Sequence, residues 1–410
     1  MKLLFIKIGK AWHTLRREGF MHGMKRIVPA GLALFGRVRP ADVLFITGGV
    51  GDSARFRTKH VAEQLGFHGI TSSVTVQDNP RLSSYADSFS VFVFHRVLFT
   101  ASVAKLIAEI KKRGKEIVFE TDDLVYDPKY LKHMDYWRVM NPLERKLYEN
   151  GVGGEILADP YVKVATTTTS FLAEKLRERG KKVIIVPNRL SISDVTTAEA
   201  LFAERSKRLR IGTGESVTIG YFSGAAGHDK DFSTITGALQ RLLTKHTNLR
   251  LLIVGPLVLD ESFGAFSDRI DRMHYVARQK HFENVACVDI NIAPLEIGNP
   301  FCEGKSELKF FEAGILGVPT VAVATQTFRE AITDGVDGFV AANESEWEDK
   351  LERLIADPDL RKRIGEAARK TALSQYVTTN ADDHEYVEYL RNAIKRTTTQ
   401  ATLSRINAQD

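Results

Sequence analysis

The feature that most constrains this chain is one local pattern that occurs twice: a short apolar strand, a glycine-rich turn and then a helix. The first copy leads from a strand at 42–47 through Gly48–Gly51 into a helix expected over 53–65. The second leads from a strand at 217–222 into the turn at 223–227. Further short β-branched runs alternate with helical stretches after each copy, which predicts parallel sheets with helices on both faces. The sequence therefore predicts an α/β protein built from two such units in series.

Chain length and pattern together predict the domain boundaries. The 410 residues fit two or three domains, at about 100–200 residues for each. The stretch 191–215 is polar and charged and lacks a strand run, so we expect it to link the two α/β units. The last helix, expected over 382–395, carries Val387, Leu390 and Ile394 on one side and should pack on the body. The predicted parts are a basic N-terminal extension at 1–40, a first domain at 41–195, a link at 196–215, a second domain at 216–377 and a C-terminal helix at 378–410.

Positive charge is concentrated at the N-terminus. The whole chain has 57 Lys and Arg against 51 Asp and Glu, a net charge of +6. Residues 1–40 alone carry nine basic side chains against Glu18, a net charge of +8, so the remaining chain is close to neutral. A nucleic-acid-binding domain is expected to be basic over its own surface. A basic arm on a neutral body favours a local role for the arm and no nucleic-acid partner.

The N-terminal segment has too few consecutive apolar residues to span a membrane. The apolar run Ile27–Phe35 has nine residues and contains Pro29, whereas a span needs about 20. Residues 8–27 are amphipathic, with apolar side chains at helical spacing and basic side chains off that stripe. Such a helix either binds an anionic membrane surface or packs on its own domain with a solvated basic face. With only two cysteines, Cys287 and Cys302, the sequence favours a cytoplasmic protein. If the N-terminal helix binds a membrane surface, the protein is expected to be peripheral at the inner face of the cell membrane.

The first glycine-rich turn, Gly49–Ala54, reads G-x-G-x-x-A between a strand and a helix. The small residues Gly49 and Gly51 let a phosphate approach the backbone, as in dinucleotide-binding sites. Such a site also needs a ribose-binding acid about 20 residues further on, and Asp78 lies well beyond that distance. Three interpretations stay open: an NAD site, a tight turn without a ligand, and the lining of an interdomain cleft.

The second glycine-rich turn continues into charged residues. Gly224 is followed by His228 and Lys230, whose side chains could reach a diphosphate. Asp229–Asp231 also forms a D-x-D pattern, which binds a metal ion in some enzymes. The same pattern recurs at Asp357–Asp359, so it is common by chance and no metal site is predicted.

The densest group of reactive side chains lies in residues 299–323. Lys305 and Ser306 are expected to begin a helix, with Lys309 one turn on and Glu312 further along. Free N–H groups at a helix start, together with two ammonium groups, would hold a phosphate. A carboxylate on the same helix can accept both hydroxyls of a ribose. The alternative is an amphipathic helix with solvated charges. Because ligands bind parallel sheets at the carboxyl ends of the strands, the site is expected where the two glycine-rich turns face each other across a cleft.

Several longer segments carry a family resemblance. They are GDSARFR at 51–57, FHRV at 94–97, VFETDDLVYDP at 118–128, VPN at 186–188, IGYFSGAAGHDKDF at 219–232, KSELKFFEAGILGVP at 305–319, ITDGVDGFV at 332–340 and DPDLRKRIGEAAR at 357–369. Through them, the chain from Asp42 to about Tyr376 resembles the retaining glycosyltransferases of the GT-B fold, family 4, or group 1. The resemblance implies two Rossmann-like domains facing across a cleft, a nucleotide-diphosphate sugar as donor, and a glycan or lipid-linked acceptor. It implies no cofactor and no metal ion.

The resemblance assigns the donor to the second domain. The family's donor motif is a Glu, seven residues and a second Glu. Glu312 matches the second, ribose-binding Glu, but the first position holds Gly304. Lys230 matches the lysine of the family's basic pair, whose arginine position is Gly224, so another lysine must supply the missing charge. The residues expected at the donor are Gly49, Gly51, Gly224, His228, Lys230, Lys305, Ser306, Lys309 and Glu312.

The acceptor is expected on the first domain. Family members often have a His or an acid at the end of the fourth strand, and Asp122 matches that position. Lys230 and Lys305 would stabilise the departing diphosphate and Asp122 would orient the acceptor hydroxyl, so these three are the catalytic candidates. The alternative for Asp122 is a helix-capping or salt-bridging acid. Further acceptor-side candidates are Arg57, His95, Arg96, Glu120 and Asp123.

Two other functions stay open. Because Gly304 replaces the family's first Glu, the chain could be a catalytically silent relative that recognises a glycan or a partner protein. The turn Gly49–Ala54 leaves an NAD-dependent enzyme as the other alternative.

Overall fold

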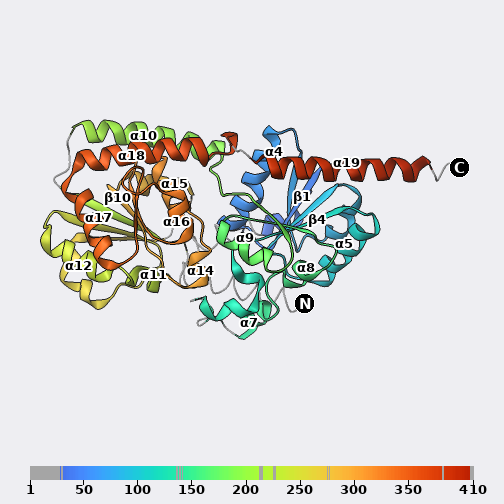
Figure 1. Cartoon of the computed structure of the whole chain (residues 1–410), viewed down its shortest axis with the longest axis horizontal. Helices are drawn as coiled ribbons and strands as arrows, with labels where there is room; N and C mark the ends of the chain where they lie inside the picture. The colour runs from blue at the N-terminus through green and yellow to red at the C-terminus, as the bar shows by residue number, and fades with distance from the viewer. Residues whose placement is uncertain are drawn as a thin grey trace. The chain divides into compact units, whose positions relative to one another are not determined.

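The computed structural model describes Val28, residues 31–134, Trp137, Met140 and residues 142–211, 216–224, 228–274, 276, 278–380 and 383–406. The chain divides into two compact units. Unit 1 comprises Met1–Pro187 with Asp382–Asp410, and unit 2 comprises Asn188–Ala381. Each unit contains one parallel sheet with helices packed around it (Figure 1). The predicted α/β architecture, with two units in series, is confirmed.

The sheet of unit 1 has six strands in the order β2-β1-β3-β4-β5-β6, and every neighbouring pair is parallel. All residues of β1 and β3 are buried, as expected for central strands covered on both faces. The strands are β1 (Val43–Thr47), β2 (Ser72–Val76), β3 (Val91–His95), β4 (Glu116–Glu120), β5 (Val164–Thr167) and β6 (Lys182–Ile185). The helical segments are α3 (Asp52–Ala54), η1 (Arg55–His60), α4 (Val61–Phe67), η2 (Leu82–Asp87), α5 (Ala101–Lys112), η3 (Leu124–Tyr126), η4 (Pro128–His133), α7 (Pro142–Tyr148), α8 (Gly154–Ala158), α9 (Ser170–Arg177) and α19 (His384–Ile406).

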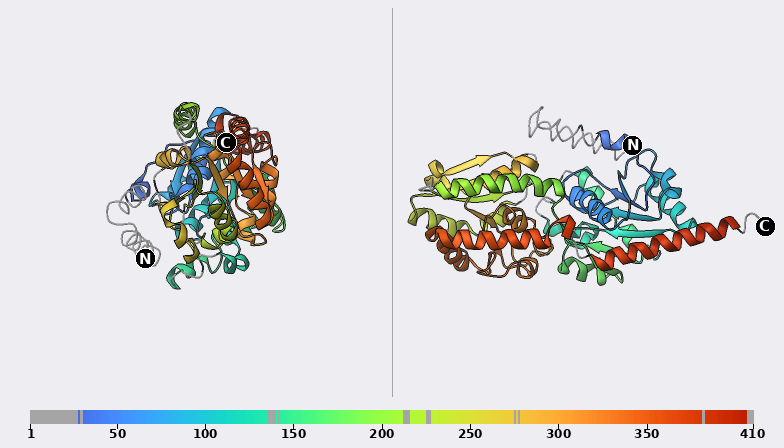
Figure 2. Two further views of the ribbon diagram at one scale, coloured as in Figure 1. Left: turned by 90° about the vertical axis from the view of Figure 1, so that its left-hand side faces the viewer. Right: turned by 90° about the horizontal axis from the view of Figure 1, so that it is seen from above.

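The C-terminal helix α19 belongs to unit 1. It begins close to where the apolar periodicity placed it and runs further, to Ile406. Tyr386, Val387 and Leu390 lie in the same buried cluster as Phe45 of the central strand β1. The turned view in Figure 2 shows α19 lying along this unit and extending beyond it. The last segment of the chain therefore completes a core that begins with the first strand.

The sheet of unit 2 also has six parallel strands, in the order β12-β11-β10-β7-β8-β9. The strands are β7 (Val217–Phe222), β8 (Leu249–Val254), β9 (Ile270–Met273), β10 (Ile290–Ala293), β11 (Thr320–Val323) and β12 (Phe339–Ala341). The helical segments are α10 (Ile192–Ile211), α11 (Asp229–Ser233), α12 (Thr236–Lys245), η5 (Glu261–Arg269), α13 (Arg278–Ala286), α14 (Pro300–Glu303), α15 (Leu308–Gly314), α16 (Gln326–Ala331), α17 (Glu344–Ala356), α18 (Pro358–Gln375) and η6 (Thr378–Asn380).

The stretch expected to link the units is instead the long helix α10 of unit 2. Glu199, Glu204 and Lys207 lie on the solvated side of this helix and its other side packs on the unit, which is why the segment lacks a strand pattern. Ala198 is buried, and the buried Arg205 donates to the carbonyls of Ala286 and Val288 at 2.9 and 2.6 Å. The boundary therefore lies earlier than predicted, at the Pro187–Asn188 bond rather than within 196–215.

The N-terminal amphipathic helix expected within residues 8–27 lies outside the described residues. No helix in the described part of the chain has both the length and the hydropathy needed to cross a membrane.

The helix after β1 forms as expected over 53–65, but part of it is π-helical. It comprises α3, η1 and α4 in succession, and η1 is the π-helical segment, a form often found near functional sites. Arg57 in this segment is 0% exposed, and its Nε and Nη2 donate to the two carboxylate oxygens of Glu120 at 2.8 and 3.1 Å. Its Nη1 donates to the carbonyl of Val186 at 2.6 Å. The pair therefore ties the first helix to the ends of β4 and β6.

Electrostatics keep Arg57 of this pair charged. Burial lowers the pKa of Arg57, but the adjacent Glu120 carboxylate outweighs it and the pKa lies above its ordinary value. Glu120 is 3% exposed and also accepts from the Thr166 hydroxyl. Removing one partner would leave a buried charge without compensation, which is far more costly than removing both.

We expect Arg57→Met to lower the free energy of unfolding by about 3–5 kcal/mol, because Glu120 is then buried alone. The double variant Arg57→Met/Glu120→Leu should recover much of that loss. Urea unfolding of the two variants and the wild type measures both effects. A double variant as unstable as the single one would contradict the role given to the unpaired charge.

Candidate functional site

The strand orders identify where each unit can hold a ligand. In unit 1, β1 lies between β2 and β3, so the connections after β1 and β2 leave in opposite directions. In unit 2, β7 lies in the same way between β8 and β10. Ligands of open parallel sheets bind outside the carboxyl ends of the strands at such a switch point. The side chains at these two positions are therefore the candidates, and each unit is described on its own.

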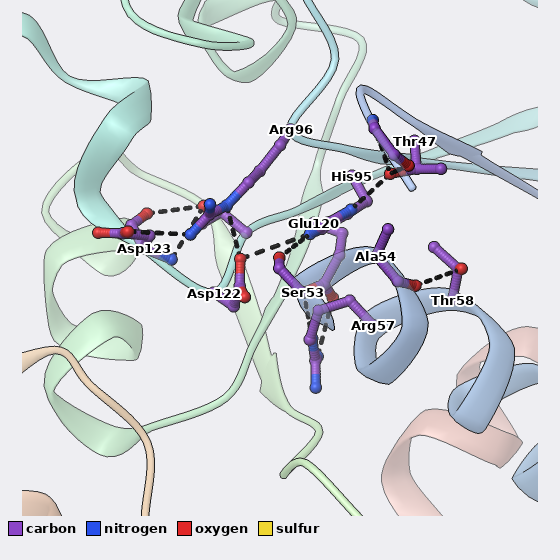
Figure 3. Close-up of polar contacts among 12 residues, drawn as sticks. Thr47, Ser53, Ala54, Arg57, Thr58, His95, Arg96, Glu120, Asp122 and Asp123 are labelled. Atoms are coloured by element: carbon purple, nitrogen blue, oxygen red, sulfur yellow. Dashed lines mark hydrogen bonds and ion pairs between the residues drawn. The ribbon is translucent and has the colours of Figure 1, made fainter. Parts of the chain in front are cut away.

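In unit 1, a histidine connects three elements at the switch point. His95, the last residue of β3, lies 3.0 Å through Nδ1 from the hydroxyl of Thr47, the last residue of β1. Its Nε2 lies 3.1 Å from the hydroxyl of Ser53 on the following helix and 3.4 Å from Oδ1 of Asp122, which follows β4 (Figure 3). His95 is almost fully buried, whereas Asp122 remains partly exposed. The cluster thus presents a carboxylate at the surface on a buried polar support.

Arg96 holds the two carboxylates that follow β4. Its Nε lies 2.6 Å from Oδ1 of Asp122, and its Nη2 donates to Oδ2 of Asp123 at 2.9 Å (Figure 3). Arg96 has φ +47°, in the left-handed region that residues other than glycine rarely adopt. A Cβ on Gly48 would lie 2.1 Å from the Arg96 carbonyl oxygen, so only glycine fits at that point of the first turn.

The environment keeps Asp122 ionised. Burial acts to raise the pKa of Asp122, but Arg96, His95 and the Ser53 hydroxyl outweigh it and hold the pKa well below its ordinary value. An ionised carboxylate accepts hydrogen bonds and does not donate them. Asp122 can therefore orient a hydroxyl group that approaches this edge of the sheet.

The sequence candidates of unit 1 fall into two groups. His95, Arg96, Asp122 and Asp123 lie together, as the acceptor-side expectation requires. The buried pair of Arg57 and Glu120 does not fit that expectation, because neither side chain has a surface for an acceptor to touch. The physical role of this pair is to fix the helix behind the cluster.

Two members of this cluster were not among the sequence candidates. Thr47 and Ser53 both lie in the first motif, one at the end of the strand and one at the start of the helix. The sequence signal that points to Thr47 is a polar residue at the last position of a buried strand. Gly49 and Gly51 lie between them, and nothing within 4 Å would meet a Cβ at either position.

In unit 2, Asp231 joins the loops that follow β7 and β10. Its Oδ2 lies 2.8 Å from Nδ1 of His228, and its Oδ1 accepts from the Glu296 N–H at 3.1 Å and the Cys302 thiol at 3.2 Å. Because these contacts span the switch point, Asp231 fixes the two loops relative to each other. The first acid of the D-x-D pattern has a different partner, since Asp229 accepts from the Val258 N–H at 2.8 Å.

These two acids do not converge on one point. Among the described residues there is also no group of three or more His, Cys, Asp or Glu side chains that could hold a metal ion. Asp231 therefore acts in this structure as a structural hydrogen-bond acceptor.

Two lysines and a histidine, Lys305, Lys309 and His228, gather around Asp231. The Lys309 ammonium lies 4.3 Å from the centroid of the Tyr221 ring, a favourable cation–π contact. Burial lowers the pKa of Lys309 to about 8, with a further lowering by Lys305 and an opposing effect of Asp231. Burial and the charge of Lys305 likewise lower the pKa of His228. Lys305 therefore lies close to both Lys309 and His228, and a diphosphate bound in this region would offset the positive charge of the lysines.

Glu312 is more constrained than the sequence indicated. Its Oε1 accepts from Arg278 and its Oε2 lies 3.2 Å from Nε2 of His281, both on α13. Burial acts to raise the pKa of Glu312, but Arg278 and His281 outweigh it and hold the pKa well below its ordinary value. Arg278 also contacts Asp194 of α10 at 3.0 Å. A ribose could reach only the remaining lone pairs of this carboxylate.

The sequence did not single out Arg278 and His281. Their segment has the sequence pattern of an exposed, charged helix. Only the burial of Glu312 shows that this carboxylate needs basic partners.

The expected helix start at Lys305 is wrong. α14 covers Pro300–Glu303, and α15 begins only at Leu308, so Lys305 and Ser306 lie in the loop between them. The reason is that Asn299 and Pro300 begin a separate short helix, which ends at Gly304. The Lys305 N–H already donates to the Cys302 carbonyl at 3.2 Å. The N–H of Lys305 is therefore already engaged, and its ammonium group is what this residue offers to a phosphate.

The remaining candidates of unit 2 lie at the edge of this region. Lys230 is exposed on α11, and Gly224 is exposed directly after β7. Ser306 accepts at its hydroxyl from the Asn188 side-chain amide at 2.9 Å. Residues 225–227 of the second turn lie outside the described residues.

A family model described as "Glycosyl transferases group 1" matches residues 216–357. No curated protein sequence matches the chain significantly.

Solved structures match both units. HepE (Alr3699) of Anabaena in complex with UDP-glucose is 13% identical with a TM-score of 0.58, over 85% of this chain and 100% of that one. The catalytic domain of starch synthase IV from Arabidopsis thaliana, bound to ADP and acarbose, is 13% identical with a TM-score of 0.60, over 87% of this chain and 99% of that one. Sucrose-phosphate synthase from Thermosynechococcus elongatus is 11% identical with a TM-score of 0.56, over 88% of this chain and 100% of that one.

At this level of identity the structural likeness concerns the fold. The two six-stranded parallel sheets with flanking helices are those of the GT-B glycosyltransferases. The chain therefore has the GT-B fold, and residues 216–357 of its second unit match the group 1 glycosyltransferase model.

Proposed function

We propose that this protein is a retaining, metal-independent glycosyltransferase that moves a sugar from a nucleotide-diphosphate sugar to a glycan or lipid-linked acceptor. One observation carries the proposal: the group 1 match covers the part of the chain in which Lys305, Lys309 and His228 gather at the switch point. Solved GT-B proteins in complex with UDP-glucose and with ADP support a nucleotide-linked donor.

The donor diphosphate would be bound by the cationic group of unit 2. Lys305 and Lys309 provide positive charge in a partly buried region, where charge-assisted hydrogen bonds to phosphate are strong. Lys230 on the neighbouring helix α11 would add to them from its exposed position. Glu312, kept ionised by its two basic partners, would accept from a ribose hydroxyl. Lys305 would bind the sugar and phosphate in place of a carboxylate at position 304, where this chain has a glycine.

The chemistry follows from the charges. The bond between the sugar C1 and the diphosphate oxygen breaks, and negative charge grows on the departing diphosphate, where fixed cations stabilise it. The acceptor hydroxyl attacks C1 from the same face, and its proton passes to a phosphate oxygen. Asp122 would orient that hydroxyl, because its pKa is held low and Arg96 fixes its position.

The alternative functions have weaker support. An NAD site needs an acid at the end of β2, but Gln77 occupies the position after this strand and accepts from the Leu98 N–H at 2.7 Å. A catalytically silent relative would keep donor or glycan binding and lack turnover. Release of nucleoside diphosphate from a nucleotide sugar distinguishes that alternative from the enzyme.

We expect UDP, GDP or ADP to raise the melting temperature, and NAD to leave it unchanged, in a thermal-shift comparison. Lys305→Ala should weaken binding of the stabilising nucleotide by at least tenfold, because a charged hydrogen bond contributes about 1.5–3 kcal/mol. Lys245→Ala, which removes an exposed lysine elsewhere in unit 2, is the matched control and should bind normally. Equal affinity of Lys305→Ala and wild type would reject the donor site, and stabilisation by NAD alone would favour the NAD-dependent enzyme.

The N-terminal segment suggests where the acceptor is met. We propose that residues 1–40 bind an anionic surface at the inner face of the cell membrane, where a lipid-linked acceptor would lie. Val28, Leu32 and Phe35 are exposed, the last two at 70% and 76%, and their spacing of four and three residues puts them on one helical face. Arg37 and Arg39 follow and are exposed as well. Apolar side chains flanked by basic ones are typical of membrane-surface segments.

We expect Leu32→Ser/Phe35→Ser to reduce co-sedimentation with phosphatidylglycerol vesicles by at least tenfold, because each buried apolar side chain contributes on the order of 1.5 kcal/mol or more. Binding should weaken as salt is raised, since the arginines interact with the surface potential. Val258→Ser, at another exposed apolar position, is the control. Unchanged vesicle binding of the double variant would refute the surface.

A further inference from the structure

The chain passes between the units twice, at Pro187–Asn188 and at Ala381–Asp382. Just inside unit 2 the two passing segments pair with each other. Leu190 and Val377 form a parallel bridge, the Leu190 N–H donates to the Tyr376 carbonyl at 2.8 Å, and the Thr378 N–H donates to the Leu190 carbonyl at 3.0 Å. We call residues 188–190 and 376–378 the crossing pair.

Both segments of the crossing pair contact the loop at 304–307, here called the donor loop. From the first segment, the buried Asn188 donates through Nδ2 to the hydroxyl of Ser306 at 2.9 Å. From the second, the Tyr376 hydroxyl donates to the buried carboxyl of Glu307. The donor loop is therefore held on both sides by side chains from the only described segments that continue into unit 1.

Packing makes the second contact rigid. The Tyr376 ring stacks on Phe311 of α15, with centroids 4.6 Å apart and planes 17° apart, and it meets Phe310 edge-on at 6.3 Å. Glu307 is the residue that precedes α15, and its carbonyl accepts from the Phe310 N–H at 2.9 Å. A shift of the donor loop would therefore displace an aromatic stack as well as a hydrogen bond.

We propose that Asn188 and Tyr376 are positioning residues that set the donor loop for a nucleoside diphosphate, and that ligand at this loop stiffens the crossing pair in return. The proposal rests on the donor site assigned to unit 2. Coupling of this kind is reciprocal. If ligand binding stabilises the crossing pair, a substitution that disrupts the crossing pair must weaken ligand binding.

The charge of Glu307 adds an independent readout. Burial raises the pKa of Glu307 to about 7, against the effect of its own backbone N–H and the Tyr376 hydroxyl. Of the charged groups around it, Glu330 raises this pKa further and Arg189 lowers it. A negative charge on Glu307 lies two residues from Lys305 and opposes binding of an anionic diphosphate.

Amide hydrogen exchange tests the coupling. In the full-length protein, the nucleotide that binds best among UDP, GDP and ADP should slow exchange at 188–190 and 376–378 as well as at 304–307. Asn188→Ala and Tyr376→Phe should weaken binding at least fivefold and abolish the slowing at the crossing pair. Tyr376→Phe keeps the aromatic stack, so it stays informative if Asn188→Ala does not fold.

The control is Tyr161→Phe, which removes a hydroxyl that donates to the Lys115 carbonyl at 2.7 Å in unit 1. It should bind like wild type. Normal affinity and normal slowing in both Asn188→Ala and Tyr376→Phe would overturn the inference while leaving the donor site intact. A wild type that binds none of the three nucleotides would instead reject the donor site and, with it, this inference.

We expect nucleotide affinity to fall as pH rises through about 7, because Glu307 then becomes negatively charged. Glu307→Gln should remove this step and retain the affinity seen at low pH. Two other groups titrate nearby. His228, with its pKa lowered, loses its positive charge at a lower pH than Glu307 titrates, and Lys309, with a pKa of about 8, loses its charge at a higher pH, so both of these losses should persist in the variant. Identical pH profiles of Glu307→Gln and wild type, measured by calorimetry, would contradict the role of Glu307.

Discussion

Compensation of buried carboxylates by fixed guanidinium groups is the constraint on which the rest of the structure depends. Three such pairs lie near the carboxyl ends of the two sheets: Glu120 with Arg57, Asp122 with Arg96, and Glu312 with Arg278. An ion taken out of water costs several kcal/mol unless a partner with good geometry offsets it. Each pair therefore constrains the positions of the surrounding loops and helices. A substitution in one of these loops would have to keep the arginine in contact with its carboxylate.

The same compensation makes the two clusters chemically useful. Dipoles and charges that are already fixed do not have to reorganise when charge develops during a reaction. In unit 1 the fixed arginine leaves an ionised acid at the surface, and in unit 2 the ammonium groups of Lys305 and Lys309 lie close enough together to repel each other. One cluster is thereby suited to a neutral hydroxyl and the other to an anion, which is the division of roles that sugar transfer from a diphosphate needs.

The sequence predicted the two α/β units and the edges at which candidate residues gather, because strand composition and glycine-rich turns are local signals. It missed α10, because a helix with one solvated charged side reads as a polar link. It placed a helix start at Lys305 because a short helix with its own cap precedes that residue. Arg278 and His281 could not be found, since their importance comes from the burial of Glu312, a long-range property.

The position of α19 has a consequence for how the protein is made. Unit 2 is contiguous in sequence, so all of its strands are available once residue 381 has left the ribosome. Unit 1 begins first but lacks Tyr386, Val387 and Leu390 of its core until the segment after unit 2 has been synthesised. During synthesis the N-terminal half therefore carries an open apolar face, exposed to chaperones and proteases, and the order of completion is the reverse of the order of synthesis.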